Sequence, residues 1–235
     1  MKIALLLSGL SRSAKLCYPN LEKFLLSKHE VDIYIHTWDV SNVSLDGSLS
    51  ENEIENDELI NLYKPKKIVI EDYFDKRDFL NQKYLKYSKT EGTYDRSISM
   101  FYKLEECFNL VEEDYDLFIR SRIDLLLNEE IDFSKVDMSS INIPVYQTTR
   151  HTFIDDTGIA YSIPPDSHGI TDCFSIGNYE NMKKYCTVFS KLDQMCIEMN
   201  LNYHPEYITL KNLELQKVNI NRSDLNYSLV RKPNR

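Results

Sequence analysis

Two arginines and an aspartate interrupt an apolar run in residues 114–133, DYDLFIRSRIDLLLNEEIDF. Side chains alternate along a strand, so Arg120, Arg122 and Asp124 are expected on one side of it. Two guanidinium groups whose residues lie about 6.6 Å apart need anionic partners, because an unpaired buried charge is costly. Their fork geometry matches a bidentate phosphate or carboxylate.

An internal ion network is the alternative to a bound ligand. In that case Asp124, Asp116 or Glu129 pairs with the arginines. Other predicted strands favour the ligand, because polar groups stand at their ends, where open α/β sheets bind ligands. These groups are Ser8, Gly9 and Arg12 after the first strand, His36, Thr37, Trp38 and Asp39 after the second, and Asp172 and Gly177 around a later one.

The elements that must position these groups follow a β-α-β-α-β rhythm. KIALLLSG, VDIYIHTWD and KKIVIED are predicted strands, and the segments between them carry helical spacing, one of them over about 54–63. Further helices are predicted from about Arg96, from a cap at Asn178 and from Pro205, with strands at TDCFSIG, KVNI and NYSLVR. This order predicts an α/β fold with a mostly parallel sheet flanked by helices.

Composition restricts the function classes. The 235 residues, 42% of them hydrophobic and 28% charged, predict one folded domain. A net charge of −9 argues against a nucleic-acid partner. The apolar run at residues 3–7 is too short for a membrane span or a secretion signal, so we expect a cytoplasmic protein. The five cysteines form no C-x-x-C pair and predict buried free thiols.

Seven segments together resemble the small nucleotide-sugar-dependent glycosyltransferases of bacterial and viral surface-glycan gene clusters, which are similar in architecture to GT-A enzymes. They are LLLSGLSRS, DIYIHTWD, SMFYKLEECFNL, YDLFIRSRIDLLL, TDCFSIGNYENMKKY, HPEYITLKNL and NYSLVR. The resemblance runs in order through most of the chain. The I-H-T-W-D and R-x-R-x-D segments are its most specific parts.

The resemblance implies a single GT-A-like, Rossmann-like domain over 1–235. Residues up to about 125 would bind the nucleotide, and residues from about 126 would face the acceptor. The implied reaction moves a sugar from a nucleotide-diphosphate sugar to a glycan or lipid-linked acceptor in surface polysaccharide biosynthesis. It implies a cytoplasmic protein without a membrane span, either free or in peripheral contact with the inner face of the membrane. The implied donor-site residues are Ser8, Gly9 and Arg12 at the nucleotide, Thr37 and Asp39 near the base or ribose, and Ser99 beside the crevice.

In this comparison Arg120, Arg122 and Asp124 occupy the place of the GT-A D-x-D motif. R-S-R-I-D offers one carboxylate where D-x-D offers two. Asp124 alone can hold Mg²⁺ or Mn²⁺ if the diphosphate completes the octahedron. Equally, the arginines can neutralise the diphosphate without a metal. Trp38, the one tryptophan, is a candidate to stack on the base, and a packed core position is its alternative.

Glycosyl transfer with inversion also needs a carboxylate that deprotonates the acceptor hydroxyl. Asp172 is the first candidate, because it precedes an apolar strand. Glu206 is the second, although a carboxylate at a helix N-terminus also stabilises the helix dipole. Asp155 and Asp156 come after these. Arg231 is a candidate to close over the diphosphate, or else an exposed tail residue.

Two other functions fit the same pattern. A nucleotidyltransferase would be expected to carry a phosphate loop rich in glycine and lysine after the first strand, where this chain has only Gly9 and Arg12. A non-catalytic domain that binds a nucleotide sugar or a glycan through a degenerate site fits the reduced R-x-R-x-D motif.

Overall fold

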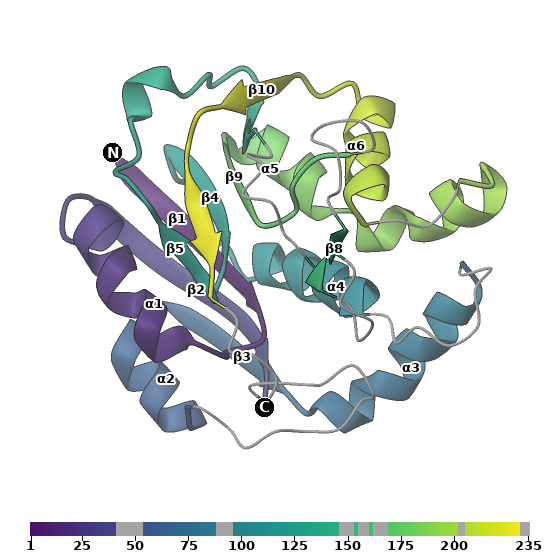
Figure 1. Cartoon of the computed structure of the whole chain (residues 1–235), viewed down its shortest axis with the longest axis horizontal. Coiled ribbons are helices and arrows are strands. Elements are labelled where there is room, and N and C mark those ends of the chain that lie inside the picture. The colour runs from purple at the N-terminus through teal and green to yellow at the C-terminus, as the bar shows by residue number, and fades with distance from the viewer. Residues whose placement is uncertain are drawn as a thin grey trace.

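A seven-stranded sheet forms the centre of the molecule, with helices on both of its faces (Figure 1). The strand order is β10-β6-β9-β4-β1-β2-β3, and β9 runs antiparallel to both neighbours whereas the other neighbouring strands are parallel. The prediction of an α/β fold with a mostly parallel sheet is confirmed. The computed structural model describes residues 1–40, 54–87, 96–145, 153–154, 160–161, 169–201 and 205–230.

The elements have the following bounds. The sheet contains β1 (Lys2–Gly9), β2 (Glu30–Trp38), β3 (Lys67–Glu71), β4 (Leu117–Arg122), β6 (Ile141–Pro144), β9 (Phe174–Gly177) and β10 (Ile220–Ser223). Two short antiparallel pairs lie outside it, β5 (Leu125–Leu127) with β11 (Tyr227–Leu229) and β7 (Phe153–Ile154) with β8 (Ala160–Tyr161). The helices are α1 (Ala14–Leu21), α2 (Asn56–Tyr63), α3 (Tyr73–Leu85), α4 (Arg96–Asn109), α5 (Tyr179–Cys186) and α6 (Pro205–Leu215).

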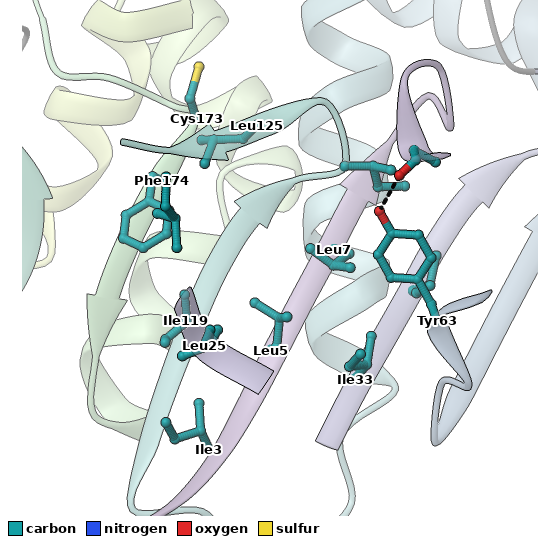
Figure 2. Close-up of a cluster of buried hydrophobic side chains, with 14 of the residues drawn as sticks. Ile3, Leu5, Leu7, Leu25, Ile33, Tyr63, Ile119, Leu125, Cys173 and Phe174 are labelled. Atoms are coloured by element: carbon teal, nitrogen blue, oxygen red, sulfur yellow. Dashed lines mark hydrogen bonds between the residues drawn. The ribbon is translucent and has the colours of Figure 1, made fainter. Parts of the chain in front are cut away.

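The central strand β1 is apolar without alternation because both of its faces are covered. Ile3, Leu5 and Leu7 point into one hydrophobic cluster, which also holds side chains of α1 and α2 (Figure 2). Ala4 and Leu6 point into a second cluster on the other face, formed with α4, α5 and α6. The sheet is therefore the middle of three layers.

Helix α4 begins at Arg96, as its amphipathic pattern predicts. The predicted cap of α5 is also confirmed, because the Asn178 side chain accepts a hydrogen bond from the Asn181 backbone N–H at 2.9 Å. However, α5 ends at Cys186, whereas the sequence NYENMKKYCTVFSKLDQMC predicts a helix that continues to Cys196. Thr187 has φ −83° and ψ 40°, which is not helical, and shorter helical turns follow it.

Two features of the region after β4 differ from the sequence-based expectation. Strand β4 ends at Arg122, and Asp124 lies in the turn that follows, so strand alternation does not extend to Asp124. Strands β5 and β6 were not expected from the sequence. They have three and four residues, which is too short for a strand period to stand out.

All five cysteines are buried and free, as predicted. Within the described ranges, no helix combines the length and the apolar character that crossing a bilayer requires.

Leu5→Ala should lower the free energy of unfolding by about 2–5 kcal/mol, because it leaves a cavity in the first cluster. The Leu5 side chain is wholly buried there. Leu16→Ala, at an exposed position on α1, should change it by less than about 0.5 kcal/mol. Urea unfolding measures both values. Equal losses for the two variants would contradict this account of the core.

Candidate functional site

The carboxyl ends of β1, β2 and β4 meet at one edge of the sheet. Ser8 is paired in register with His36 on one side and with Arg122 on the other. The chain runs from β1 to β2 and β3 in one direction, and β4 then lies on the opposite side of β1. Open α/β sheets bind ligands at such a change of direction, beyond the carboxyl ends of the strands. The β1–β4 junction is therefore the candidate site.

Gly9 closes β1 with a backbone φ of +114°, which side-chain-bearing residues rarely adopt. Its carbonyl oxygen accepts a hydrogen bond from Thr37 Oγ1 at 2.7 Å. The carbonyl of Thr37 accepts in turn from the Nζ of Lys103, on α4, at 2.8 Å. These bonds fix the ends of β1 and β2 relative to each other and to α4.

At the β1–β4 junction, Asp124 is bonded to two arginines. Arg122 donates from Nε to Oδ1 and from Nη2 to Oδ2, each at 2.7 Å. Arg12, in the loop after β1, donates from Nε to Oδ2 at 2.9 Å. Burial by itself would raise the pKa of Asp124, but the charges and hydrogen bonds of Arg122 and Arg12 outweigh it and lower this pKa to about 2.

The internal ion network considered from the sequence is thus present for Arg122. Asp124 is the carboxylate that pairs with Arg122. The other two candidates bond elsewhere: Asp116 accepts from the Lys2 backbone N–H and Glu129 from the Asn226 backbone N–H. Only Nε of Arg12 meets Asp124, so its terminal nitrogens are not needed for that contact. Two guanidinium groups thus share the Asp124 carboxylate, and Asp172 is a second carboxylate whose charge acts on Arg122.

Arg120 is not part of this network. Its side chain is fully buried, and its three guanidinium nitrogens have no hydrogen-bond partner in the described part of the chain. It follows Phe118 on the side of β4 that faces α4 and α5. The structure therefore separates two arginines that the strand pattern grouped together.

Trp38 is buried in a third cluster, among side chains of α3, α4 and α6. Its indole N–H donates to Ser99 Oγ at 3.0 Å, and Lys103 Nζ lies 3.4 Å from the ring centroid. Asp39, the next residue, accepts from the Tyr73 backbone N–H at 3.0 Å. Ser99, Trp38 and Asp39 thus lie together at the end of β2, in a packed environment.

Lys103 is a buried charge that the sequence analysis did not single out. Its ammonium group donates to Glu71 Oε2 at 2.7 Å, and burial lowers its pKa to about 8 against the opposing effect of Glu71. The Nε2 of His36 lies 3.7 Å from Glu71 Oε2, and the pKa of His36 is lowered to about 3 by burial and then by Lys103. His36 is therefore neutral near pH 7.

The candidate base Asp172 lies at the same edge, because β9 begins beside the end of β4. The Arg122 backbone N–H donates to the Cys173 carbonyl at 3.2 Å, and Cys173 Sγ donates to Asp172 Oδ1 at 3.2 Å. Glu206, at the start of α6, lies beside the segment that leads into Asp172, since its carbonyl accepts a hydrogen bond from the Ile170 N–H at 3.2 Å.

The remaining candidates, Arg231, Asp155 and Asp156, lie outside the described residues. Val230, which precedes the first of them, is nevertheless placed. Its N–H donates to the Asp124 carbonyl at 2.9 Å, and its own carbonyl accepts from Ser13 Oγ at 3.2 Å. The chain therefore reaches the β1–β4 junction directly before Arg231.

A divalent cation does not fit Asp124 as it stands. Both of its oxygens accept from guanidinium groups, so a cation there would stand beside two positive charges. Elsewhere in the described ranges, no three His, Cys, Asp or Glu side chains are grouped as metal ligands. The positive groups available for a phosphate at this edge are therefore the arginines themselves.

The chain matches no protein-family model, and no curated protein is significantly similar to it.

Asp124→Asn should lower the free energy of unfolding by about 3–5 kcal/mol at pH 7, because two arginines lose their buried partner. The loss should shrink in acid. The folded pKa of Asp124 lies below its ordinary value of 3.8, so its contribution is complete above about pH 5 and is lost as the pH falls toward 2. The difference between parent and variant should narrow by about 1 kcal/mol between pH 7 and pH 3.

Urea unfolding at a series of pH values measures this difference in the free energy of unfolding. The other carboxylates are the same in parent and variant, so their titration contributes equally to both. Asp114→Asn, at an exposed position near the start of β4, is the control and should show no such trend. A difference that stays constant from pH 7 to pH 3 would mean that the Asp124 carboxylate is not held by the two arginines.

Proposed function

We propose that this chain is a glycosyltransferase that moves a sugar from a nucleotide-diphosphate sugar to a glycan or lipid-linked acceptor in surface polysaccharide biosynthesis. The observation that carries the proposal is the pair of guanidinium groups, from Arg12 and Arg122, at the β1–β4 junction. Both lie where an α/β sheet binds its ligand, and Arg12 bonds to Asp124 through Nε alone. Guanidinium groups recognise phosphate oxygens through paired hydrogen bonds.

The chemistry requires a stabilised leaving group. The acceptor oxygen attacks the anomeric carbon, the bond from that carbon to the diphosphate oxygen breaks, and the diphosphate leaves with the bonding electrons. Arg12 and Arg122 would offset the charge that develops on it. In an inverting reaction Asp172 would take the proton of the acceptor hydroxyl, since it lies beside the same junction.

The order of sequence segments adds support, because each half of the proposed site comes from a segment that resembles the glycosyltransferases named above. Residues 1–125 contain β1, β2 and β4 and would hold the donor. Residues 126–235 contain β9 and α6, which carry or adjoin Asp172 and Glu206, and would face the acceptor. We place the reaction in the cytoplasm, with peripheral membrane contact where the acceptor is lipid-linked.

A non-catalytic domain that binds a nucleotide sugar is the second candidate. It is favoured by one observation: Asp124, which stands in place of a metal-binding motif, is fully engaged by arginines. Binding and transfer assays on the same preparation distinguish the two functions.

Arg12→Ala should weaken donor binding by roughly tenfold to a hundredfold, because it removes a charge-assisted contact to phosphate. Calorimetry with UDP-, GDP-, CMP- and dTDP-sugars measures the effect and identifies the nucleotide. Stability should change less than in Asp124→Asn, since Arg122 keeps both of its bonds to Asp124. Lys15→Ala, which removes a nearby exposed cation paired with Glu58, is the matched control. Equal donor affinity in the two variants would exclude Arg12 from the donor site.

Asp172→Asn should reduce sugar transfer by about 10²–10⁴-fold while donor affinity stays within about threefold of the parent, because only the proton acceptor is lost. Glu206→Gln is the comparison, and the variant that loses transfer identifies the base. Transfer is measured by release of the nucleoside diphosphate in the presence of acceptor. A parent protein that binds a nucleotide sugar but neither transfers nor hydrolyses it would support the binding domain instead.

A further inference from the structure

Arg120 is a charge buried without a partner. None of its side chain is exposed, and its Nε, Nη1 and Nη2 make no hydrogen bond in the ranges that the structure describes. It lies on the same side of β4 as Phe118, which packs against α4 and α5, so the guanidinium lies between these helices and the sheet. An isolated guanidinium in such a place is costly to maintain.

Tyr185 on α5 is the second unsatisfied group in this place. Its side chain is also fully buried, and its hydroxyl has no hydrogen-bond partner among the described residues. Phe118, on the same side of β4 as Arg120, packs in one cluster with Tyr185, so both unsatisfied groups lie on this face of the sheet. Buried tyrosine hydroxyls usually find a partner, so two unmatched groups together point to a missing third.

The surrounding side chains do not supply the missing negative charge. Cys107 and Cys173 are neutral thiols, because burial raises the pKa of each to about 12. The charge of Asp172 acts on Tyr185, but this carboxylate accepts from Cys173 Sγ and makes no hydrogen bond to Arg120. Water molecules could satisfy the hydrogen bonds of Arg120 but would leave its charge uncompensated.

We propose that Arg120 and Tyr185 form a binding site for an oxyanion, a phosphate or carboxylate group of a small ligand. The guanidinium fork supplies two parallel N–H donors and the phenol supplies an O–H donor, which together match the oxygens of one such group. Ser8 Oγ and His36 Nδ1, on the same side of the sheet, are also buried without partners and offer further polar contacts.

This site differs from the arginine pair at the β1–β4 junction in its bonding, although Ser8 lies in register with Arg122. Arg12 and Arg122 both bond to Asp124, whereas Arg120 makes no bond to it. The inference therefore goes beyond the proposed glycosyl transfer and does not depend on it. A phosphate would come from a phosphate ester, and a carboxylate from an acidic sugar.

The experiment compares the parent with Arg120→Met and Tyr185→Phe in a buffer free of phosphate, sulfate and carboxylates. Phosphate, pyrophosphate and glucuronate are added at constant ionic strength, and the melting temperature is followed. A bound oxyanion at a hundredfold excess over its Kd should raise the parent's melting temperature by roughly 5–10 °C. Whether phosphate or glucuronate binds more tightly identifies the source of the oxyanion.

Arg120→Met should melt at or above the parent without anions, because it replaces an uncompensated buried charge with an apolar chain of similar length. Added oxyanions should then produce no shift. Tyr185→Phe, which removes a single oxygen, should bind about tenfold more weakly. Tyr63→Phe is the control on the opposite face, where the hydroxyl already donates to the Ala14 carbonyl (Figure 2). It should bind the oxyanion like the parent.

The proposal is overturned if no oxyanion raises the parent's melting temperature, or if Tyr185→Phe binds as tightly as Tyr63→Phe. It is also overturned if Arg120→Met folds, melts below the parent and still responds to oxyanions. Should Arg120→Met not fold, the comparison of the two tyrosine variants decides. Loss of sugar transfer plays no part in these readouts.

Discussion

The bond between Asp124 and two arginines is the interaction on which the strand-end region depends. It joins the loop after β1 to the end of β4, and the Asp124 backbone accepts from Val230 as well. Segments more than a hundred residues apart in the chain are therefore held at one point. A buried carboxylate is stable there only because its charge is matched by the arginines. These bonds therefore hold the loop after β1, the end of β4 and the end of β11 together.

The requirement that a buried charge be matched also applies to the other buried cations. It distinguishes those with protein partners, which are structural, from those that can bind a ligand. Lys103 has Glu71, the Thr37 carbonyl and the Trp38 ring around it and needs nothing further. Arg120 has no such set. Since the chain as a whole carries a net charge of −9, an unmatched positive group inside it is a local feature of the sheet face and not an effect of composition.

The sequence predicted the order of the main elements because their signals are strong. β1 is a continuous apolar run, and α4 carries a clear helical stripe. It did not predict that Asp124 lies outside the strand. The turn at Ile123 and Asp124 contains no glycine or proline, the residues by which a turn is usually recognised in a sequence. Lys103 had a readable signal: it lies three residues after Met100 and four before Cys107, on the apolar face of α4.

Pairing of buried charges, by contrast, depends on tertiary distances that no spacing rule contains. Arg120 and Arg122 are alike in type and in strand face, yet one has a carboxylate and the other has none. The difference arises because Arg122 ends β4, beside the turn that carries Asp124, whereas Arg120 lies two residues further back in the strand. One change of chain direction thus determines which arginine stabilises the fold and which is left for a ligand.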